Sequence, residues 1–519
     1  MSKYLKARRE AALFALVASI TLVAVPAATA QDAFLVESEF GILANSVANL
    51  HAQGDSLWVG PFLNLSADGG ASWLVAGADS LGRGANRVFS LDVEGDVVWV
   101  GLGRSDRSTG ESVQTAAGFL VSTDGGKTFA YRFPQLDSPG DDTIEYGVNT
   151  LSALDVIVPQ QSPPFDIDYD PVRDEIWVAG WASGIRLSSD GGLTWRRVVL
   201  PPDDFDYVHP DSVYNFRVEP QRGGTGELNH MGFGVLVDEV GTVWAGTPAG
   251  LNRSEDGGSS WQRFSHDGTS TSLPGNWVIS IEEQPLPGRN PVWISTWNSG
   301  GGGTAQFGAA VTRDGGETFT PVLQGEKVYD FAFRGESVYV AGDGGLFISE
   351  DGGLTWTGVR DFRDQIRPER FIRPGASIFS VATTENALWV GTEDGLLRST
   401  DGGQTWLINR VEIPTNPSTP TDEVPRVGAF AYPNPFSPAI DRFVRLRYEL
   451  AAAGSIRIRI LDFGMGLVRE WSDDRLPGLG ESIWDGRDAN GSRLANGPYF
   501  YTITGPSGFQ AKGKILVIE

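Results

Sequence analysis

The stretch that decides the fold reads Ser254-Glu255-Asp256-Gly257-Gly258-Ser259-Ser260-Trp261, and the chain repeats its pattern seven times. The copies of this Asp-Gly-Gly repeat are Ser66–Trp73, Ser122–Phe129, Ser188–Trp195, Ser254–Trp261, Thr312–Phe319, Ser349–Trp356 and Ser399–Trp406. An aspartate before two glycines predicts a tight turn, because the carboxylate can accept hydrogen bonds from backbone N–H groups and glycine adopts positive φ without strain. A residue needed seven times indicates a scaffold, so we interpret the seven aspartates as structural.

A second run of four residues recurs upstream of each repeat. Its copies are Leu57–Gly60, Val98–Gly101, Ile176–Ala179, Val243–Gly246, Val292–Ser295, Val338–Ala341 and Leu388–Gly391. These apolar, β-rich runs are typical of buried strands. Other apolar runs precede them, such as Ile378–Val381, or follow them, such as Gly395–Arg398. The order predicts four antiparallel strands per unit, with the Asp-Gly-Gly turn between the third and the fourth.

The spacing of the units indicates how they are assembled. The shortest interval, from Asp314 to Asp351, is 37 residues, and the longer intervals carry insertions. Four-stranded units at this period are typical of β-propeller blades, whereas a β-helix has shorter and more regular periods. We predict an all-β chain: a seven-bladed β-propeller over residues 31–413, followed by a small Ig-like β-sandwich.

From Ser46 to Ile413 the repeats resemble the Asp-box, or BNR, repeat. Proteins of that kind include sialidases, xyloglucan-cleaving glycoside hydrolases, sortilin-type receptors and bacterial propellers similar to the photosystem II assembly factor. The resemblance implies that each box is a structural hairpin remote from any catalytic centre. It is specific for the fold and says little about function.

The N-terminus has the pattern of a secretory signal peptide over residues 1–30. A basic segment, Lys3–Arg9, precedes an apolar run, Ala11–Val25, and Ala28-Thr29-Ala30 fits the signal peptidase site. The run is shorter than the ~20 residues of a spanning helix, so we expect cleavage before Gln31 and no membrane span in the mature chain. The pattern predicts a secreted or cell-surface location. The sequence contains no cysteine, which excludes disulfides and a lipid-modified cysteine.

The net charge of −24 limits the possible partners. Acidity argues against nucleic acid, because like charges repel. From Phe430 onward eleven Lys and Arg nearly balance ten Asp and Glu, so the acidity lies in the predicted propeller.

Residues 414–426 are rich in Pro and Thr and predict a linker to a second domain, residues 427–519. There, Val444–Tyr448 and Ile456–Ile460 alternate apolar residues with arginines, which predicts strands with one buried and one wet face. With Tyr432–Phe436, this segment resembles the Ig-like domain of flagellar hook-capping proteins and the C-terminal sorting domains of the type IX secretion system. The resemblance implies export machinery as a partner. An accessory sandwich that merely follows the propeller is the alternative.

The sequence predicts no catalytic, cofactor-binding or metal-binding residue and no cofactor. Adjacent carboxylates occur at Asp141-Asp142, Asp203-Asp204, Glu282-Glu283 and Asp473-Asp474. In so acidic a chain we interpret them as solvated surface. The four histidines, His51, His209, His230 and His266, lack the spacing of a zinc site. Gly300–Gly303 lacks the Lys-Ser or Lys-Thr of a phosphate loop.

Long insertions are the better place for binding, because long loops in compact domains are often functional. They are Ala130–Asp170, Pro201–Gly232, Phe264–Asn276 and Arg360–Pro374. Within them, Asp203–Tyr207 mixes carboxylates with aromatic rings that could hold a sugar or a basic peptide, or simply pack down.

Two functions remain open from the sequence. The first is a non-catalytic propeller that binds a protein or polysaccharide, and the alternative is a glycoside hydrolase of the sialidase- or xyloglucanase-like Asp-box group. Carboxylates that converge with arginines in the pore would favour the hydrolase. An apolar or merely acidic pore would favour binding. A third possibility, an envelope assembly factor, would need a basic or polar groove.

Overall fold

The computed structural model describes residues 34–38, 41–76, 81, 86–107, 110–221, 224–288, 290–298, 304–366, 368, 370–411, 429–432, 434–438 and 443–518. The predicted signal peptide (1–30), the predicted linker (414–426) and the run Gly300–Gly303 lie outside these ranges. Within them the chain is built of β-strands, with two short 3-10 turns, η1 (Leu228–His230) and η2 (Pro506–Gly508). No helix in these ranges is both long and apolar enough to cross a membrane.

Seven antiparallel sheets follow one another along the described part of the chain up to Val411. The first sheet holds β1 (Leu35–Glu37), β2 (Leu50–Gln53), β3 (Ser56–Val59), β4 (Asn64–Ser66) and β5 (Leu74–Ala76). The second holds β6 (Arg87–Glu94), β7 (Val97–Asp106), β8 (Val113–Ser122) and β9 (Ala130–Arg132). The third holds β12 (Pro164–Asp170), β13 (Glu175–Gly180), β14 (Gly184–Ser188) and β15 (Arg196–Arg197).

The remaining four sheets have the same order of strands. The fourth holds β18 (Gly234–Val237), β19 (Val243–Thr247), β20 (Gly250–Ser254), β21 (Trp261–Phe264) and the added strand β16 (Tyr207–Val208). The fifth holds β22 (Trp277–Glu283), β23 (Val292–Trp297), β24 (Gly308–Thr312) and β25 (Thr320–Val322). The sixth holds β26 (Val328–Arg334), β27 (Ser337–Gly342), β28 (Gly345–Ser349) and β29 (Thr357–Val359). The seventh holds β30 (Ile378–Thr383), β31 (Leu388–Thr392), β32 (Gly395–Ser399) and β33 (Leu407–Asn409).

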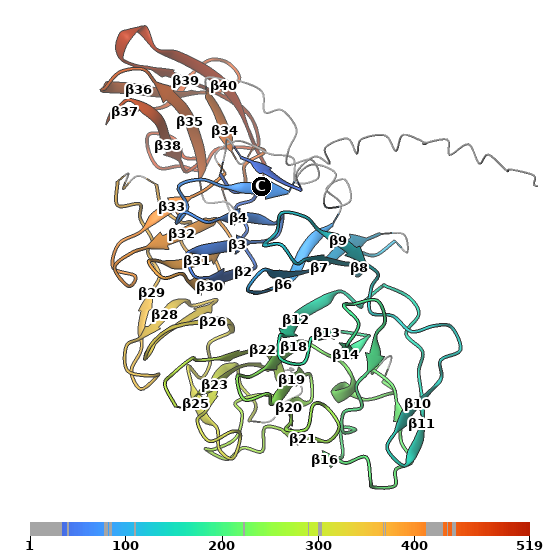
Figure 1. The fold of residues 1–519 in the computed structure, drawn as a ribbon. Coiled ribbons are helices and arrows are strands. Elements are labelled where there is room, and N and C mark those ends of the chain that lie inside the picture. The colour runs from blue at the N-terminus through green and yellow to red at the C-terminus, as the bar shows by residue number, and fades with distance from the viewer. Residues whose placement is uncertain are drawn as a thin grey trace, which may run out of the picture. The chain divides into compact units, whose positions relative to one another are not determined.

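The sheets form a closed ring (Figure 1). Their first strands contact one another in the order β2, β6, β12, β18, β22, β26 and β30, and β30 contacts β2 again. At the closure the backbone N–H of Val47 donates to the carbonyl of Thr392 at 2.9 Å. A ring of antiparallel sheets whose first strands surround the axis is a β-propeller, so the predicted fold class is confirmed.

Each Asp-Gly-Gly repeat forms the hairpin between the third and fourth strands, as predicted. In six of the seven repeats the second glycine also lies under the tryptophan of the preceding sheet's buried run, and in the seventh Gly403 faces Ile348 instead. A Cβ on Gly258 would lie 2.6 Å from Cη2 of Trp177, and one on Gly126 would lie 2.3 Å from Cη2 of Trp58. At the closure Gly70 faces Trp389 in the same way. The two recurring sequence runs are therefore the two halves of one contact between neighbouring sheets.

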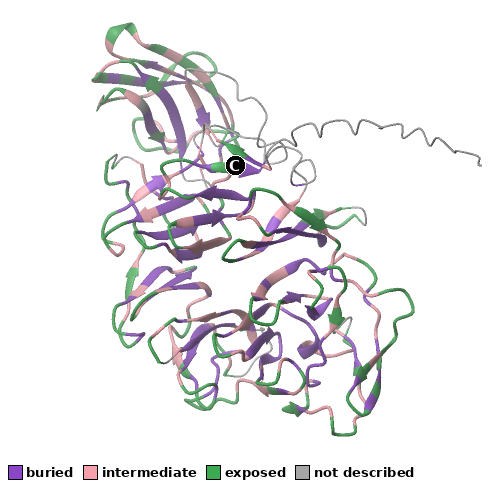
Figure 2. Ribbon diagram, viewed as in Figure 1, coloured by how far each residue is buried: buried purple, intermediate pink, exposed green. Residues whose placement is uncertain are grey.

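The core lies between neighbouring sheets, where buried strands face one another (Figure 2). Trp99 and Phe119 of the second sheet, for example, pack with Ile167, Ile176 and Val178 of the third. Burial of such aromatic and branched side chains is the main stabilising contribution to a cysteine-free chain, at roughly 25 cal/mol per Å² of apolar surface.

Packing accounts for much of the two longest insertions. Their strands β10 (Thr143–Tyr146), β11 (Asn149–Ala153) and β17 (Arg217–Val218) form a small sheet of their own, with β11 and β17 parallel. Leu151 and Val218 are buried in one core cluster with residues of the third and fourth ring sheets.

The C-terminal part forms two further antiparallel sheets. One contains β34 (Ala429–Tyr432), β35 (Val444–Leu450) and β38 (Gly478–Trp484). The other contains β36 (Gly454–Leu461), β37 (Leu467–Arg475), β39 (Gly497–Thr504) and β40 (Gln510–Val517). Both contribute to one buried core cluster.

The predicted wet face of the C-terminal strands is right for β36 and wrong for β35. In β36 the isoleucines are buried and Arg457 and Arg459 are exposed. In β35, however, Arg445 and Arg447 are only 5% and 4% exposed. Arg445 is buried because it pairs with carboxylates of two different sheets, as described below.

Candidate functional site

The seven repeat aspartates lie at the outer corners of the ring sheets and serve their own turns. In the fourth sheet Oδ1 of Asp256 accepts the N–H of Ser260 at 2.8 Å and Oδ2 accepts its hydroxyl at 2.7 Å. The Ser254 hydroxyl donates to Asp256 and accepts the N–H of Gly258. All seven repeats make the equivalent contacts from the aspartate to the fourth residue after it. The geometry supports a structural role for them.

These turn hydrogen bonds favour the charged carboxylate. The hydroxyl and the N–H of Thr194 lower the pKa of Asp190 to about 2, and Thr355 does the same for Asp351. A carboxylate held so firmly in its charged form at an exposed corner is a poor general acid.

A different set of carboxylates lines the inner edges of the sheets. We call Asp92, Asp166, Asp168, Glu282 and Asp330 the inner carboxyl cluster. The backbone groups at the inner edge of each sheet face no further strand of that sheet, so they need other partners. Oδ2 of Asp330 accepts the N–H of Val381 at 2.9 Å, and Oδ2 of Asp92 accepts that of Tyr169 at 2.8 Å. Each of these aspartates therefore joins its own first strand to that of the next sheet.

The third sheet makes the same contact twice. Asp166 accepts the N–H of Val235 at 2.9 Å, and Asp168 accepts that of Val237 at 3.2 Å. Of the cluster, Glu282 alone has no hydrogen-bond donor within the described residues.

Burial and mutual repulsion disfavour the charged forms of the cluster. Burial raises the pKa of Asp166 to about 7, with Asp92 and Asp330 acting in the same direction. Burial likewise raises the pKa of Asp330 to about 7. The pKa of Glu282 is raised well above its ordinary value by burial, and then by the charges of Asp330, Asp166, Asp168 and Asp92.

Within the described residues, one basic side chain acts on the pKa of the inner carboxyl cluster. The imidazole of His51, whose Nδ1 lies 4.0 Å from Oδ1 of Asp92, lowers the pKa of Asp92, and no arginine of the described chain acts in that way. The solvated-surface interpretation of Glu282-Glu283 is wrong for Glu282, which is half-buried because the propeller brings it close to the carboxylates of Asp330, Asp166, Asp168 and Asp92.

Aromatic side chains gather where the first strands begin. In β6, β12, β26 and β30 the register shifts by one residue at Phe89, Phe165, Tyr329 and Phe379, and Phe233 stands just before β18. A β-bulge re-aims the side chain of its extra residue. Neighbouring first strands run in the same direction, because contacts between them advance together along both strands, as from Asn49 with Phe89 to His51 with Val93. The pairs β6 and β12, β12 and β18, and β26 and β30 show the same advance. These five aromatic side chains therefore lie at the same end of the propeller axis.

Neighbouring rings are in contact, and three tryptophans extend them. We call Phe89, Phe165, Trp181, Phe233, Trp277, Trp297, Tyr329 and Phe379 the aromatic rim; all are half-exposed. Ring centroids are 6.2 Å apart for Phe89 and Phe165 and 6.0 Å apart for Phe165 and Phe233. Trp181 and Phe233 are 4.9 Å apart.

In the fifth, sixth and seventh sheets, the aromatic side chain of Tyr329 contacts those of Trp297 and Phe379. Nζ of Lys327 lies 4.0 Å from the centroid of Trp297 and 5.3 Å from that of Tyr329. The rim thus already holds one ammonium group against two aromatic faces.

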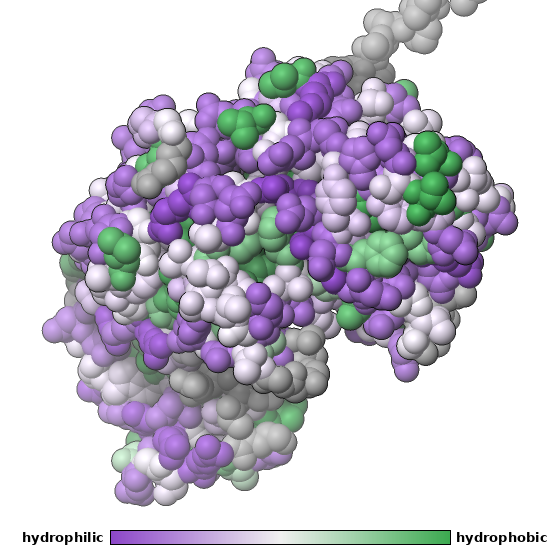
Figure 3. All heavy atoms as spheres, turned by 90° about the horizontal axis from the view of Figure 1, so that it is seen from below, coloured by the Kyte–Doolittle hydropathy of each residue, from purple (hydrophilic) through white to green (hydrophobic). Residues whose placement is uncertain are grey.

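A pocket of about 340 Å³ opens beside the rim. Phe165 and Trp181 form its aromatic walls, and Glu111, Gln114 and Gln161 supply polar groups. This volume is within the range of small-ligand sites. On the face drawn in Figure 3, hydrophilic residues predominate and hydrophobic residues lie in separate small groups.

The loop residues that the sequence put forward are mostly engaged elsewhere. Phe205 packs against Tyr214 and Phe216, and Asp203 accepts the N–H groups of Leu228 and Asn229. Phe205 nevertheless stays 37% exposed and Tyr207 50% exposed, so the aromatic side chains of this loop are only partly packed down. The four histidines lie apart, and no group of three or more metal-ligating side chains forms within the described ranges.

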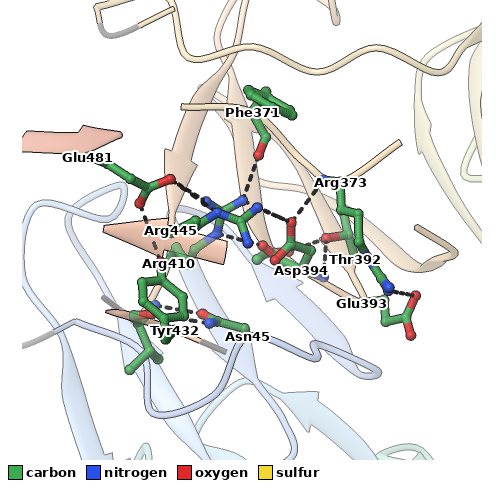
Figure 4. Close-up of polar contacts among 12 residues, drawn as sticks. Asn45, Phe371, Arg373, Thr392, Glu393, Asp394, Arg410, Tyr432, Arg445 and Glu481 are labelled. Atoms are coloured by element: carbon green, nitrogen blue, oxygen red, sulfur yellow. Dashed lines mark hydrogen bonds and ion pairs between the residues drawn. The ribbon is translucent and has the colours of Figure 1, made fainter. Parts of the chain in front are cut away.

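A second charged cluster joins the seventh ring sheet to the C-terminal sheets (Figure 4). Asp394 lies in the turn after β31, Arg410 follows β33, Arg445 lies in β35 and Glu481 in β38. Nη2 of Arg410 and of Arg445 lie 3.0 and 2.8 Å from Oδ2 of Asp394, and Nε of Arg445 lies 3.1 Å from Oε1 of Glu481. Arg410 also donates to the carbonyl of Phe371 at 2.7 Å. We call these four charged residues the interface network.

The interface network balances its charges. The side chains of Arg410 and Glu481 are 0% and 2% exposed. Although burial disfavours its charge, Asp394 and Glu481 hold the pKa of Arg410 above its ordinary value. The two arginines pair with the two carboxylates across the junction, so this cluster connects the two parts of the chain.

Sequence reasoning missed the aromatic rim, although a signal was present. Val328-Tyr329-Asp330-Phe331 and Ile378-Phe379-Ser380-Val381 stand out as strands, and in each an aromatic residue comes second. Val88-Phe89-Ser90 and Pro164-Phe165-Asp166 repeat that placement. The sequence shows an aromatic residue at the same place in several units, but it does not show the β-bulge that re-aims the side chain.

Comparisons with known proteins add little beyond the fold. No protein-family model matches the chain, and no curated protein matches it. Solved structures similar to it include YCF48 bound to D1 peptide, with 15% identity over 72% of this chain and 97% of that one and a TM-score of 0.41. PorZ, a surface component of the type-IX secretion system of Porphyromonas gingivalis, has 15% identity over 91% and 75%, with a TM-score of 0.35. The GH74 enzyme of Niastella koreensis has 12% identity over 94% and 75%, with a TM-score of 0.49. At these values the propeller assignment depends on the sheets described above.

Proposed function

We propose that this protein is a secreted or cell-surface, non-catalytic β-propeller of the Asp-box type, which binds a protein or polysaccharide at its aromatic rim. The observation that carries the proposal is the rim itself. Half-exposed rings from the third, fourth, fifth and sixth sheets meet at one end of the ring, beside a pocket of about 340 Å³. Large rings that remain exposed in several units at once are typical of binding surfaces.

The inner carboxyl cluster supports binding rather than hydrolysis. Its four aspartates each accept a backbone N–H from the next sheet, a structural task that accounts for their position. A pore with carboxylates but no converging arginines is the arrangement expected of a binding protein rather than of a hydrolase of this group.

The location is also part of the proposal. The signal-peptide pattern of residues 1–30 supports export, and we propose that residues 427–519 are an Ig-like module that assists export and stays attached. Separating it from the ring would leave the charges of Arg410 and Asp394 without Arg445 and Glu481. The same junction buries Phe443 against Phe371, with ring centroids 5.3 Å apart, and exposing such apolar surface to water costs free energy.

The test compares the purified full chain with rim variants. Trp277→Ala and Tyr329→Ala remove rings from two separate parts of the rim, and Phe463→Ala removes a 75% exposed ring of the C-terminal sheets. Screening against arrayed oligosaccharides and extracellular proteins should identify a ligand of the wild type. Phe463→Ala should bind that ligand as the wild type does, and at least one rim variant should bind it about tenfold more weakly. Equal binding by all three variants would contradict the proposal.

One observation favours the glycoside hydrolase as a second candidate. Glu282 lacks a hydrogen-bond donor within the described chain, and its pKa is raised well above the ordinary value, as in a general acid. Release of reducing sugar by the wild type and not by Glu282→Gln would support the hydrolase. If neither releases sugar from glycans that they bind, the hydrolase is excluded for those glycans.

A further inference from the structure

We propose that the pocket beside the aromatic rim binds an arginine side chain of a partner protein. The inference rests on the proposed function and makes it more specific, because it names the chemistry of the ligand and the residues that select it. Trp181 and Phe165 supply faces for the guanidinium, Glu111 supplies the opposite charge, and Gln114 and Gln161 supply amide groups.

The chemistry of the pocket fits a planar cation. Its lining contains one carboxylate, from Glu111, and no basic side chain. The Glu111 carboxylate has no hydrogen-bond or ion-pair partner within the described ranges. Arginine can stack its planar group on an aromatic ring while it donates two hydrogen bonds to a carboxylate, which lysine cannot do.

The rim itself shows that its rings take a cation. Lys327 places its ammonium 4.0 Å from the centroid of Trp297, on the same rim. Trp181 and Phe165 have no such cation from the described part of the chain. The pocket therefore offers two aromatic side chains, as the site of Lys327 does, and no cation of the described chain lies over them.

Charge around the pocket acts in the same direction. The chain has a net charge of −24, and the segment before Phe430 carries all of it, because the residues from Phe430 onward sum to +1. The exposed Glu111 adds a carboxylate of the same sign within the pocket itself. A surface of one sign raises the local concentration of ligands of the other sign. A neutral glycan would use the same rings but would gain nothing from this charge.

Backbone bonds hold one polar wall of the pocket in place. Gln161 has a φ of 59°, in the left-handed region that side chains seldom adopt. Its N–H donates to the carbonyl of Gln114 at 2.7 Å, and its carbonyl accepts the N–H of Ala182 at 2.8 Å. These contacts fix Gln161 between the hairpin strand of Gln114 and the residue after Trp181.

The experiment uses the full chain and three pools of fluorescein-labelled nonapeptides that differ only at the central residue. That residue is arginine, lysine or citrulline, the last being a neutral isostere of arginine. By fluorescence anisotropy the arginine pool should bind about tenfold more tightly than the citrulline pool, with lysine between them. Equal binding of arginine and citrulline would overturn the inference.

Two pairs of variants locate the effect. Glu111→Gln and Trp181→Ala should each weaken the arginine pool about tenfold. Glu317→Gln removes an exposed carboxylate from the fifth-sheet repeat, Phe463→Ala removes an exposed ring, and both should bind as the wild type does. Equal binding by all variants would indicate diffuse attraction to an acidic surface and overturn the inference. Because Glu111 is exposed, its substitution is a test even if Trp181→Ala does not fold.

The outcomes separate this inference from the proposed function. Oligosaccharide binding that Trp181→Ala abolishes and Glu111→Gln leaves intact would overturn the arginine pocket and leave the rim as the binding surface. Binding of a partner that no rim variant affects would contradict both.

Discussion

Two sets of aspartates in this molecule do the same work in opposite surroundings. The repeat aspartates, such as Asp190, accept backbone N–H groups of their own turn at the exposed outer corners. The inner aspartates, such as Asp330, accept one N–H from the next residue and one from the next sheet. Both satisfy backbone donors that the strands leave free.

The surroundings give the two sets opposite electrostatics. Hydroxyl and N–H donors lower the pKa of Asp190 to about 2, whereas burial raises the pKa of Asp330 to about 7. The charge state of an aspartate in this fold therefore cannot be inferred from the sequence alone, because it depends on the neighbouring groups. The comparison also distinguishes a carboxylate that stabilises the fold when charged from one that destabilises it.

The largest effect is expected where buried carboxylates do have cationic partners, in the interface network. Arg410→Met should lower the free energy of unfolding by about 3–5 kcal/mol, because Asp394 and Glu481 lose a partner in a buried site. Arg459→Met is the control, since that arginine is 46% exposed beside Glu470. Urea unfolding measures both. A loss of under 1 kcal/mol in Arg410→Met would mean that water reaches the network.

The outer corners can be tested through their glycines. Gly258→Ala should cost about 3 kcal/mol, because its φ of 81° is strained for alanine and the new Cβ would lie 2.6 Å from Cη2 of Trp177. Gly257→Ala has similar strain, with a φ of 68°, but its Cβ would meet nothing within 4 Å, so about 1–2 kcal/mol is expected. Thermal and urea unfolding of the pair separate the sheet contact from the turn. Equal losses of unfolding free energy in the two variants would contradict a specific contact between Gly258 and Trp177.

The inner cluster predicts a dependence of stability on pH. Asp330 keeps its proton up to about pH 7 in the folded chain, whereas an unfolded aspartate loses it near its ordinary pKa of 3.8. The folded state thus binds more protons between about pH 4 and 7, and stability falls as the pH rises through that window. Asp330→Asn should reduce this fall by about 1–2 kcal/mol, less than the full shift implies because the side chain is half-exposed.

The repeat aspartates give the control with the opposite sign. Their lowered pKa stabilises the folded state above about pH 4, and this stabilisation is lost as the pH falls towards 2. Asp351→Asn should therefore leave the change in stability between pH 5 and 8 as it is in the wild type. If Asp351→Asn and Asp330→Asn alter the change in stability between pH 5 and 8 equally, the outer and inner aspartates do not differ in the way described.

Local repetition made the propeller predictable from the sequence. Strand runs and turns recur because each ring sheet is built from nearby residues, so Asp256 and Gly257 announce their hairpin directly. The contact of Gly258 with Trp177 was not predictable, because it joins residues of different sheets. Arg445 misled the strand pattern for the same reason, since its partners Asp394 and Glu481 come from distant segments.

The candidate site was largely hidden from sequence reasoning. Glu282 resembles any surface glutamate until the ring brings Asp92, Asp166 and Asp330 near it. The aromatic rim depends on bulges, and a bulge adds one residue without a clear signature. Only the repeated aromatic position, as in Phe165 and Tyr329, could have indicated it.

Titration of the aspartate carboxyl carbons by NMR tests the comparison most directly. With the signals assigned through Asp190→Asn and Asp330→Asn, the account predicts a corner group that titrates near pH 2 and a central group that titrates near pH 7. Two groups that both titrate near pH 4 would contradict it.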